Sequence, residues 1–181
     1  MLVYQFQHLG KNTIILPFLG ILSVKSDMRQ ATLCFLLKDN QILLAMKKRA
    51  FGQGKWNGVG GKPNPNENIK DTAIRETEEE IKVTPKNIEL MAVLDFHFKY
   101  KPEWDQQVLA YITTEWEGDP TETEEMKPQW FDLDKIPYNS MWTSDTLWLP
   151  LILKNKKVKG KVIFGENETI ISKKVYEIQH F

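Results

Sequence analysis

A polar loop followed by a glutamate-rich segment, residues 60–83, constrains this chain more than any other feature. The stretch reads GGKPNPNENIKDTAIRETEEEIKV, and after its loop small and apolar residues recur at helical spacing. Asn68 is a suitable N-cap, and Asp71 falls in the first turn, where the helix dipole favours an acid. The pattern therefore predicts a helix over residues 69–81.

Three glutamates crowd one patch of this predicted helix. Glu76 lies three and four residues before Glu79 and Glu80, and residues at these spacings share a helix face. Like charges there repel by roughly 0.2–0.5 kcal/mol per pair, at a C-terminal end where the dipole prefers cations. A divalent cation would remove both penalties, and carboxylate oxygens suit Mg²⁺ or Mn²⁺. On the glutamates alone, a solvated acidic face explains the pattern equally well.

The wider spacing resembles the Nudix box, G-x5-E-x7-R-E-u-x-E-E-x-G-u, in which u is a bulky apolar residue. Two positions depart from this pattern. Thr77 stands at a bulky apolar position, and Lys82 replaces the glycine that closes the helix. The helix therefore either bears a left-handed strain of about 1 kcal/mol or ends differently. The residues that match the fixed positions of the box are Gly61, Glu67, Arg75, Glu76, Glu79 and Glu80.

Beyond the box, residues 32–164 resemble the MutT-like oxidised purine nucleoside triphosphate hydrolases. The resemblance is closest in MKKRAFGQGKWNGVGGK (46–62), EEMKPQWFDLDKIP (124–137) and MWTSDTLWLPLIL (141–153). It implies an α/β Nudix fold, a mixed β-sheet sandwiched between α-helices. It also implies metal-dependent hydrolysis of oxidised purine nucleoside triphosphates to monophosphate and pyrophosphate, which would sanitise the nucleotide pool. The implied substrate is 8-oxo-dGTP, with 2-hydroxy-dATP as a second candidate.

Carried over residue by residue, the resemblance implies a metal site on the box helix. Arg75 would orient the glutamates through charge-assisted hydrogen bonds. Glu125, in the acidic connection 117–125, would be an additional ligand or part of the water-activating apparatus, and a solvated loop acid is its alternative. The proton of the attacking water would go to Glu76 or Glu79, with Glu125 as rival. The implied ligands are the carbonyl of Gly60 and the carboxylates of Glu76, Glu79, Glu80 and Glu125, with Mg²⁺ as the cofactor and Mn²⁺ as its alternative.

The same resemblance implies a nucleotide pocket with a phosphate end and a base end. Lys47 and Lys62 would lie along the triphosphate. Flat aromatic faces would hold the purine, although plain core packing is the alternative for each aromatic. Asn57 can donate and accept at the purine edge, and Asp145 can accept or, if protonated, donate. The implied substrate residues are Thr32, Lys47, Phe51, Asn57, Val59, Gly60, Gly61, Lys62, Phe96, Trp142, Thr143, Ser144, Asp145, Trp148 and Phe164.

One position of the base pocket departs from the animal-type enzymes, which carry adjacent aspartates after the tryptophan. Here the pair is Ser144-Asp145. Two neighbouring acids can share a proton and so switch between hydrogen-bond patterns, whereas Ser144 cannot carry a negative charge. The sequence therefore predicts a different breadth of purine discrimination, with narrower tolerance as the working hypothesis.

Outside the box helix, β-rich segments dominate and favour a mixed sheet. Residues 38–40 predict a hairpin turn. Residues 146–155 predict a second helix with Trp148, Leu151 and Ile152 facing inward. The predicted strands cover residues 31–37, 41–47, 88–98, 107–114, 129–133, 161–164 and 170–178.

The first 27 residues differ from the rest of the chain. They contain TIILPFLGILSV (13–24), an apolar run too short to span a bilayer and interrupted by Pro17 and Gly20. A signal peptide is an alternative, weakened by the lack of a small-residue cleavage site. We expect a leader over residues 1–27 that is disordered or not part of the natural start, followed by one Nudix domain over residues 28–181.

Charge and cysteine content limit the partners. The 24 basic and 24 acidic residues cancel, and no basic stripe indicates a nucleic-acid polymer as partner. The single cysteine, Cys34, lies in an apolar run and predicts a buried structural thiol. We expect a cytoplasmic monomer that acts on a small-molecule nucleotide, with no membrane and no nucleic-acid polymer as partner.

Three rival functions remain open on the sequence. Another Nudix substrate, such as a dinucleoside polyphosphate or a nucleotide sugar, would use the same metal chemistry. A nucleotide sensor without turnover is expected to have lost a metal ligand, and all the box glutamates are present. A purely structural acidic helix leaves WNGVGG, residues 56–61, without an explanation.

Overall fold

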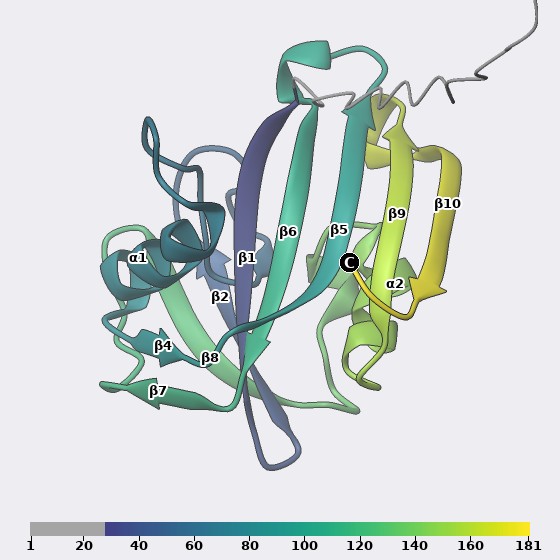
Figure 1. The fold of residues 1–181 in the computed structure, drawn as a ribbon. Coiled ribbons are helices and arrows are strands. Elements are labelled where there is room, and N and C mark those ends of the chain that lie inside the picture. Colours follow the sequence, from purple (N-terminus) through teal and green to yellow (C-terminus); the bar gives the residue numbers. More distant parts are fainter. Residues whose placement is uncertain (1–27) are drawn as a thin grey trace, which may run out of the picture.

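Strand β1 (Arg29–Lys38) lies inside a mixed eight-stranded sheet and buries side chains on both faces. The computed structural model of the chain describes residues 28–181. Figure 1 shows the strands of this sheet running side by side. In order across the sheet they are β10 (Ile170–Ile178), β9 (Lys157–Phe164), β5 (Glu89–Phe98), β6 (Gln106–Thr113), β1, β2 (Gln41–Lys47) and β3 (Trp56–Asn57), and β8 (Met126–Asp132) also pairs with β2.

The pairing directions make the sheet mixed, as expected. β1 runs parallel to β6 and β5 runs parallel to β9, whereas the other neighbouring strands of this sheet are antiparallel. The predicted hairpin at residues 38–40 is confirmed, because Lys38 pairs with Gln41 across a tight turn. Asp39 adopts a left-handed φ of 55° there, a conformation that aspartate tolerates better than most residues.

Within residues 28–181, two α-helices cover opposite faces of the sheet. Adjacent residues of β1 divide between two cores: Cys34 packs in the core that contains helix α1 (Ile69–Ile81), and Phe35 packs in the core that contains helix α2 (Asp145–Ile152). This division follows from the period of two along a strand. Figure 1 shows α1 beside β1 and α2 behind β9. The predicted sandwich of a mixed sheet between helices is confirmed.

The predicted bounds of α1 are confirmed at both ends. Asn68 caps the helix by accepting a hydrogen bond from the backbone N–H of Lys70 at 2.8 Å. At the other end Lys82 adopts the left-handed conformation, with φ 64° and ψ 31°, so the helix bears the strain that a glycine would avoid. Thr77 is tolerated in the core because its hydroxyl donates to the carbonyl of Ala73 at 2.7 Å.

Helix α2 is shorter than predicted. It ends at Ile152 rather than at residue 155, because the chain turns there and Asn155 takes a left-handed φ of 58°. Trp148 and Ile152 are buried as predicted, but Leu149 is also buried and Leu151 is only half-buried.

Several short elements were not predicted. β4 (Thr84–Lys86) and β7 (Glu115–Glu117) form a separate two-stranded sheet. In the described part of the chain, the connections contain three 3-10 turns, η1 (Pro102–Trp104), η2 (Tyr138–Ser140) and η3 (Glu166–Glu168). Two of them, η1 and η3, reach the site described below. β9 begins at Lys157 rather than at residue 161, and β8 covers Met126–Asp132 rather than residues 129–133.

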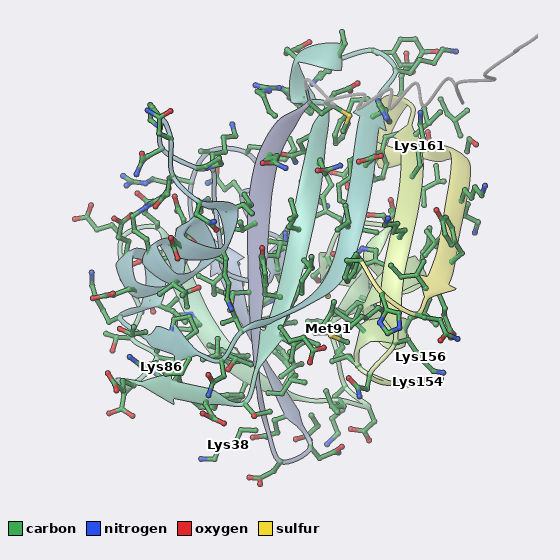
Figure 2. All side chains as sticks on the ribbon, in the orientation of Figure 1. Lys38, Lys86, Met91, Lys154, Lys156 and Lys161 are labelled. Carbon is green, nitrogen blue, oxygen red and sulfur yellow. The ribbon has the colours of Figure 1, made fainter. Side chains whose placement is uncertain are left out.

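The balanced charge is spread over the outside of the molecule. Lys38, Lys154 and Lys156 are exposed at its periphery (Figure 2). Cys34 is fully buried, as predicted, and burial raises the pKa of its thiol to about 12. No helix within residues 28–181 is long and apolar enough to cross a membrane. The expected leader, residues 1–27, lies outside the described residues.

Candidate active site

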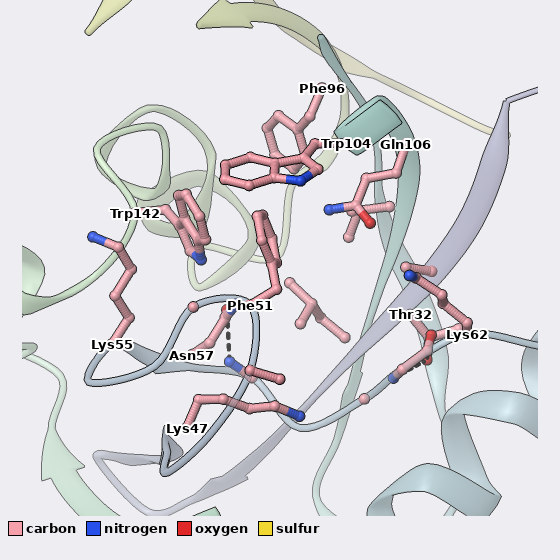
Figure 3. A pocket seen from close by; sticks show the side chains of 18 of the residues that line it. Thr32, Lys47, Phe51, Lys55, Asn57, Lys62, Phe96, Trp104, Gln106 and Trp142 are labelled. Atoms are coloured by element: carbon pink, nitrogen blue, oxygen red, sulfur yellow. Dashed lines mark hydrogen bonds between the residues drawn. The ribbon is translucent and has the colours of Figure 1, made fainter. Parts of the chain in front are cut away.

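A cavity of about 630 Å³ opens between the loop after β2, the ends of β5 and β9, and the loop that precedes α2 (Figure 3). Its size falls in the range of small-ligand sites. Most residues predicted for the substrate line this cavity, although they come from distant parts of the chain. They are Thr32, Lys47, Phe51, Asn57, Gly60, Gly61, Lys62, Phe96, Trp142, Ser144, Asp145 and Phe164.

Three predicted substrate residues lie beside the cavity without lining it. Val59 is fully buried in the core under α1. Thr143 is exposed and donates its hydroxyl to the carbonyl of Glu168 at 2.8 Å. Trp148 is fully buried and contacts Asp145 from behind. These three residues are therefore placed to support the walls of the cavity.

The glycine pair forms a strap against β1. The backbone N–H of Thr32 donates to the carbonyl of Gly61 at 2.8 Å, and the N–H of Gly61 lies 3.3 Å from the hydroxyl of Thr32. A Cβ on Gly60 would collide with the Thr32 carbonyl, and a Cβ on Gly61 would collide with the Glu76 carboxylate. Only glycine allows this close approach of the strap to both the strand and the helix.

Arg75 lies at the centre of the acidic cluster on α1. Its guanidinium forms a fork on Glu67, with Nε 2.7 Å from Oε1 and Nη2 2.9 Å from Oε2. Its Nη1 also contacts Oε1 of Glu76 at 2.8 Å and Oε2 of Glu79 at 2.9 Å. Arg75 lowers the pKa of Glu67 to about 2. The arginine thus holds Glu76 and Glu79 in fixed orientations, as an orienting residue would.

Glu80 is the buried member of the cluster. Its side chain is 5% exposed, and it accepts hydrogen bonds from Lys47 Nζ at 2.9 Å and from the backbone N–H of Gly60 at 3.2 Å. Burial raises the pKa of Glu80, and the hydrogen bond from Lys47 partly offsets this effect. A buried carboxylate with a raised pKa gains from a nearby cation.

Glu125 lies across the loop from α1 and is held by basic residues. It forms an ion pair with Arg49, and its Oε2 lies 3.9 Å from Lys47 Nζ. Lys47 therefore stands between Glu125 and Glu80. Arg49 lowers the pKa of the Glu125 carboxyl, which keeps it ionised.

The donor set around the strap fits a hard divalent cation in its chemistry. All the candidate donors are oxygens, which suits Mg²⁺ or Mn²⁺. Within residues 28–181 no three acidic, imidazole or thiol side chains already converge as a metal centre. The glutamates are engaged instead by Arg75, Lys47 and Arg49. Binding of a cation would exchange some of these ion pairs for metal ligation.

The opposite end of the cavity is aromatic. Phe51 stacks on Trp142 with ring centroids 5.0 Å apart and an interplanar angle of 26°. It makes a T-shaped contact with Trp104, with ring centroids 4.9 Å apart. Figure 3 shows Phe51 beside Trp142 and close to Trp104. Behind them, Phe98 stacks on Phe164 with centroids 4.9 Å apart. A flat purine requires faces of this kind.

Polar groups flank the aromatic end. The Asp145 carboxyl is 3% exposed and accepts hydrogen bonds from the backbone N–H of Trp142 and from Nε1 of Trp148, each at 3.2 Å. Burial raises the pKa of Asp145 to about 7, so near neutral pH this group can either accept or donate. Asn57 accepts a hydrogen bond from the N–H of Gly58 at 2.8 Å, which leaves its NH₂ group as a donor.

Several cavity residues were missed from the sequence. Trp104 lies on η1, and Gln106 follows it at the start of β6. Lys55 lies on the loop before β3. A tryptophan within a polar connection was a signal that could have identified Trp104, because binding residues lie on loops disproportionately often. Lys55 carried no comparable signal among so many lysines.

Comparison with known proteins agrees with this geometry. Residues 27–152 match the model of the NUDIX domain. The chain is 40% identical to the oxidized purine nucleoside triphosphate hydrolase of Mus musculus over 156 residues, which is 86% of this chain and 99% of the mouse protein. It is also 40% identical to the Danio rerio protein of that name, over 82% of this chain and 94% of that protein. The MutT protein of Bacillus halodurans has a similar structure, with a TM-score of 0.73 and 25% identity over 82% of this chain and 97% of its own. By sequence, by fold and by the arrangement of its glutamates, this chain belongs to the Nudix family.

Proposed function

We propose that this protein hydrolyses oxidised purine nucleoside triphosphates, with 8-oxo-dGTP as the main substrate, to the monophosphate and pyrophosphate, and so sanitises the nucleotide pool. The observation that carries the proposal is a single cavity with two chemically different ends. Gly60, Lys62 and Glu76 line one end, and Trp142 and Asp145 line the other. The names of the mouse and zebrafish relatives support the same substrate class.

The phosphate end is equipped to hold a cation and a polyphosphate. We propose that Glu76, Glu79, Glu80 and the Gly60 carbonyl hold Mg²⁺, or Mn²⁺ in its place, with Glu125 as an additional ligand. When bound, the cation neutralises phosphate charge and lowers the pKa of a water molecule. Lys62 would lie along the phosphates. Lys47 shares that role, and its pairing with Glu80 offsets part of the cost of burying that carboxylate.

Glu76 is the box glutamate best placed to take the proton of the attacking water. It lines the cavity, whereas Glu79 is 60% exposed on the outer side of the helix. Arg75 fixes the Glu76 carboxylate, and the glycine strap approaches it closely. Orientation of this kind is what general-base catalysis requires.

The base end would recognise the purine by stacking against its ring and by hydrogen bonds to its edge. Trp142 would offer an aromatic face to the purine in place of Phe51, which stacks on it in this structure. Asn57 offers a donor, and Asp145 offers an acceptor or a donor according to its protonation. Such paired polar groups can discriminate an oxidised edge from an ordinary one, because the wrong edge leaves a buried polar group unpaired.

Analysis of the products tests the proposed reaction. The protein is incubated with 8-oxo-dGTP and Mg²⁺, and phosphorus NMR follows the products. We expect 8-oxo-dGMP and pyrophosphate in equal amounts. Release of inorganic phosphate with 8-oxo-dGDP would contradict the proposed bond cleavage.

We also propose a monomeric cytoplasmic protein whose catalytic unit is residues 28–181. A single buried cysteine fits a reducing compartment. The hydrolytic activity and the sedimentation of a chain that begins at Met28 test whether residues 28–181 form a monomeric catalytic unit. Loss of activity on removal of residues 1–27, or a dimer in solution, would contradict it.

A further inference from the structure

Three loops from distant parts of the chain meet at the ammonium group of Lys55. Its Nζ lies 2.8 Å from Oε2 of Glu168 and 3.4 Å from the carbonyl oxygen of Met141. The same Nζ lies 5.0 Å from the centroid of the Trp142 ring. One cation therefore contacts the η3 turn and the segment before α2, which includes the indole that forms a wall of the cavity. Figure 3 shows Lys55 beside Trp142.

The Glu168 turn is built against the same segment. The backbone carbonyl of Glu168 accepts a hydrogen bond from the hydroxyl of Thr143 at 2.8 Å, while its carboxylate receives Lys55. Asn167 and Glu168 both have left-handed backbone angles, φ 51° and 60°. Such conformations persist when surrounding contacts hold them in place.

The backbone of the Lys55 loop also lies close to the indole. Gly52 has a φ of 82°, and a Cβ at this position would lie 3.5 Å from the Trp142 ring. The Lys55–Glu168 pair is better shielded than an ordinary surface pair, since the two side chains are 25% and 31% exposed. A shielded ion pair and a cation above an aromatic face both restrict side-chain motion.

We infer that Lys55 is a positioning residue for base recognition, which with Glu168 holds Trp142 and the 141–145 segment in the orientation that receives the purine. This inference rests on the proposed function. The segment also carries Asp145, so that one clasp aligns both the stacking face and a polar group of the base end. The clasp is defined here as Lys55, Glu168 and Thr143.

Binding of nucleoside monophosphates without metal tests the clasp separately from catalysis. Calorimetry measures the Kd of 8-oxo-dGMP and dGMP for the wild type, Lys55→Met, Lys55→Arg, Glu168→Gln and the double variant Lys55→Met/Glu168→Gln. We expect Lys55→Met to weaken 8-oxo-dGMP binding about five- to tenfold. Lys55→Arg should restore binding to within about twofold, because arginine keeps both the charge and the contact with the ring. The double variant should be no weaker than Lys55→Met, because the two residues act through one contact.

A matched control comes from another ion pair. Lys157 lies 3.0 Å from Glu89 and is 31% exposed, but it does not line the cavity. Lys157→Met should leave both dissociation constants unchanged. If it weakened 8-oxo-dGMP binding as much as Lys55→Met, the effect would be a general loss of charge and the clasp would be rejected.

The resonance of the Trp142 indole N–H gives a readout that needs no nucleotide. The chain has six tryptophans, and Trp142→Phe identifies the signal. In the free protein, Lys55→Met should shift or broaden this signal and Lys55→Arg should leave it near its wild-type position. Weaker binding with an unchanged signal would mean that Lys55 touches the nucleotide directly, which would overturn the positioning role. If the wild type did not bind 8-oxo-dGMP more tightly than dGMP, the proposed function would fail. The indole signal would still show whether Lys55 positions Trp142.

Discussion

The carboxylate of Asp145 accepts a hydrogen bond of 3.2 Å from the indole nitrogen of Trp148, and both side chains are almost fully shielded from water. The acid therefore sits at the bottom of the base end on a rigid hydrophobic support. Its second hydrogen bond, from the backbone of Trp142, ties it to the aromatic wall. Because the acid is buried in this way, its affinity for protons is raised.

The pH dependence of stability should reveal Asp145. Burial raises its pKa from 3.8 to about 7, so between these values the folded protein binds a proton that the unfolded chain releases. Ionisation of the buried Asp145 carboxyl lowers the free energy of unfolding of the wild type. This loss is absent below about pH 4, grows as the pH rises, and is complete above about pH 7. The unfolding free energy of Asp145→Asn minus that of the wild type should therefore rise with pH, by at most about 1.4 kcal/mol per pH unit. Urea unfolding at several pH values measures it, and a constant difference would contradict the assignment.

Neutralising the box glutamates should abolish turnover. Glu76→Gln, Glu79→Gln and Glu80→Gln together remove the charges that would hold the cation, and we expect kcat to fall by at least about 100-fold. Glu78→Gln is the matched control, because Glu78 is exposed on the same helix. Among the described residues, its side chain forms no hydrogen bond or ion pair with Glu76, Glu79 or Glu80. Pyrophosphate release and Mn²⁺ binding are the measurements. Wild-type activity in the triple variant would refute the catalytic assignment.

The strained end of α1 predicts a gain in stability. Lys82→Gly removes a side chain from a left-handed position and should raise the unfolding free energy by about 0.5–1 kcal/mol. Lys82→Ala is the control, because alanine also loses the hydrogen bond from Lys82 Nζ to Glu79 but keeps its Cβ. Urea denaturation compares the two variants. Equal stability of the glycine and alanine variants would show that no strain is stored there.

Trp104 should contribute to nucleotide affinity. Its ring meets Phe51 at 4.9 Å and Phe98 at 5.7 Å, so its loss would loosen the aromatic end. We expect Trp104→Ala to raise the KM for 8-oxo-dGTP about tenfold, with kcat within about twofold of the wild type. Tyr100→Ala is the control, since Tyr100 lies on the same connection but is 58% exposed and does not line the cavity. Equal effects of both variants would count against a specific role.

Ser144 should limit the range of oxidised purine nucleotides that the protein hydrolyses efficiently. Ser144 is buried next to Asp145, so Ser144→Asp would place two acids where they can share a proton. We expect this variant to raise the efficiency on 2-hydroxy-dATP relative to 8-oxo-dGTP by about tenfold. Ser144→Asn, of similar size but without a titrating group, should not do so. Comparable wild-type kcat/KM values for 2-hydroxy-dATP and 8-oxo-dGTP would contradict the predicted narrower tolerance for purines.

Local patterns in the sequence were sufficient for the elements that local chemistry determines. The bounds of α1 follow from Asn68 and the helical periodicity, and the β1–β2 hairpin follows from its turn residues. The second helix was predicted too long because the turn at Asn155 depends on how the chain meets β9. Short elements such as β4 and β7 exist only because they pair with each other.

The cavity could be predicted only in part for the same reason. Family resemblance indicated residues within long matching segments, such as Asn57 and Trp142. The contact of Lys55 with Glu168 depends on the sheet, which brings the end of β9 beside the loop after β2. No local pattern specifies such a long-range contact, and Trp104 entered the cavity through an unpredicted turn.

The ratio of kcat/KM for 8-oxo-dGTP to that for dGTP, measured with Mg²⁺ under matched conditions, is the decisive measurement of the proposed substrate preference. ADP-ribose and a dinucleoside tetraphosphate complete the comparison. We predict a ratio of at least about tenfold, and negligible turnover of the other two. A ratio near one, or faster cleavage of ADP-ribose or the dinucleotide, would contradict the proposed substrate while leaving the Nudix family assignment intact.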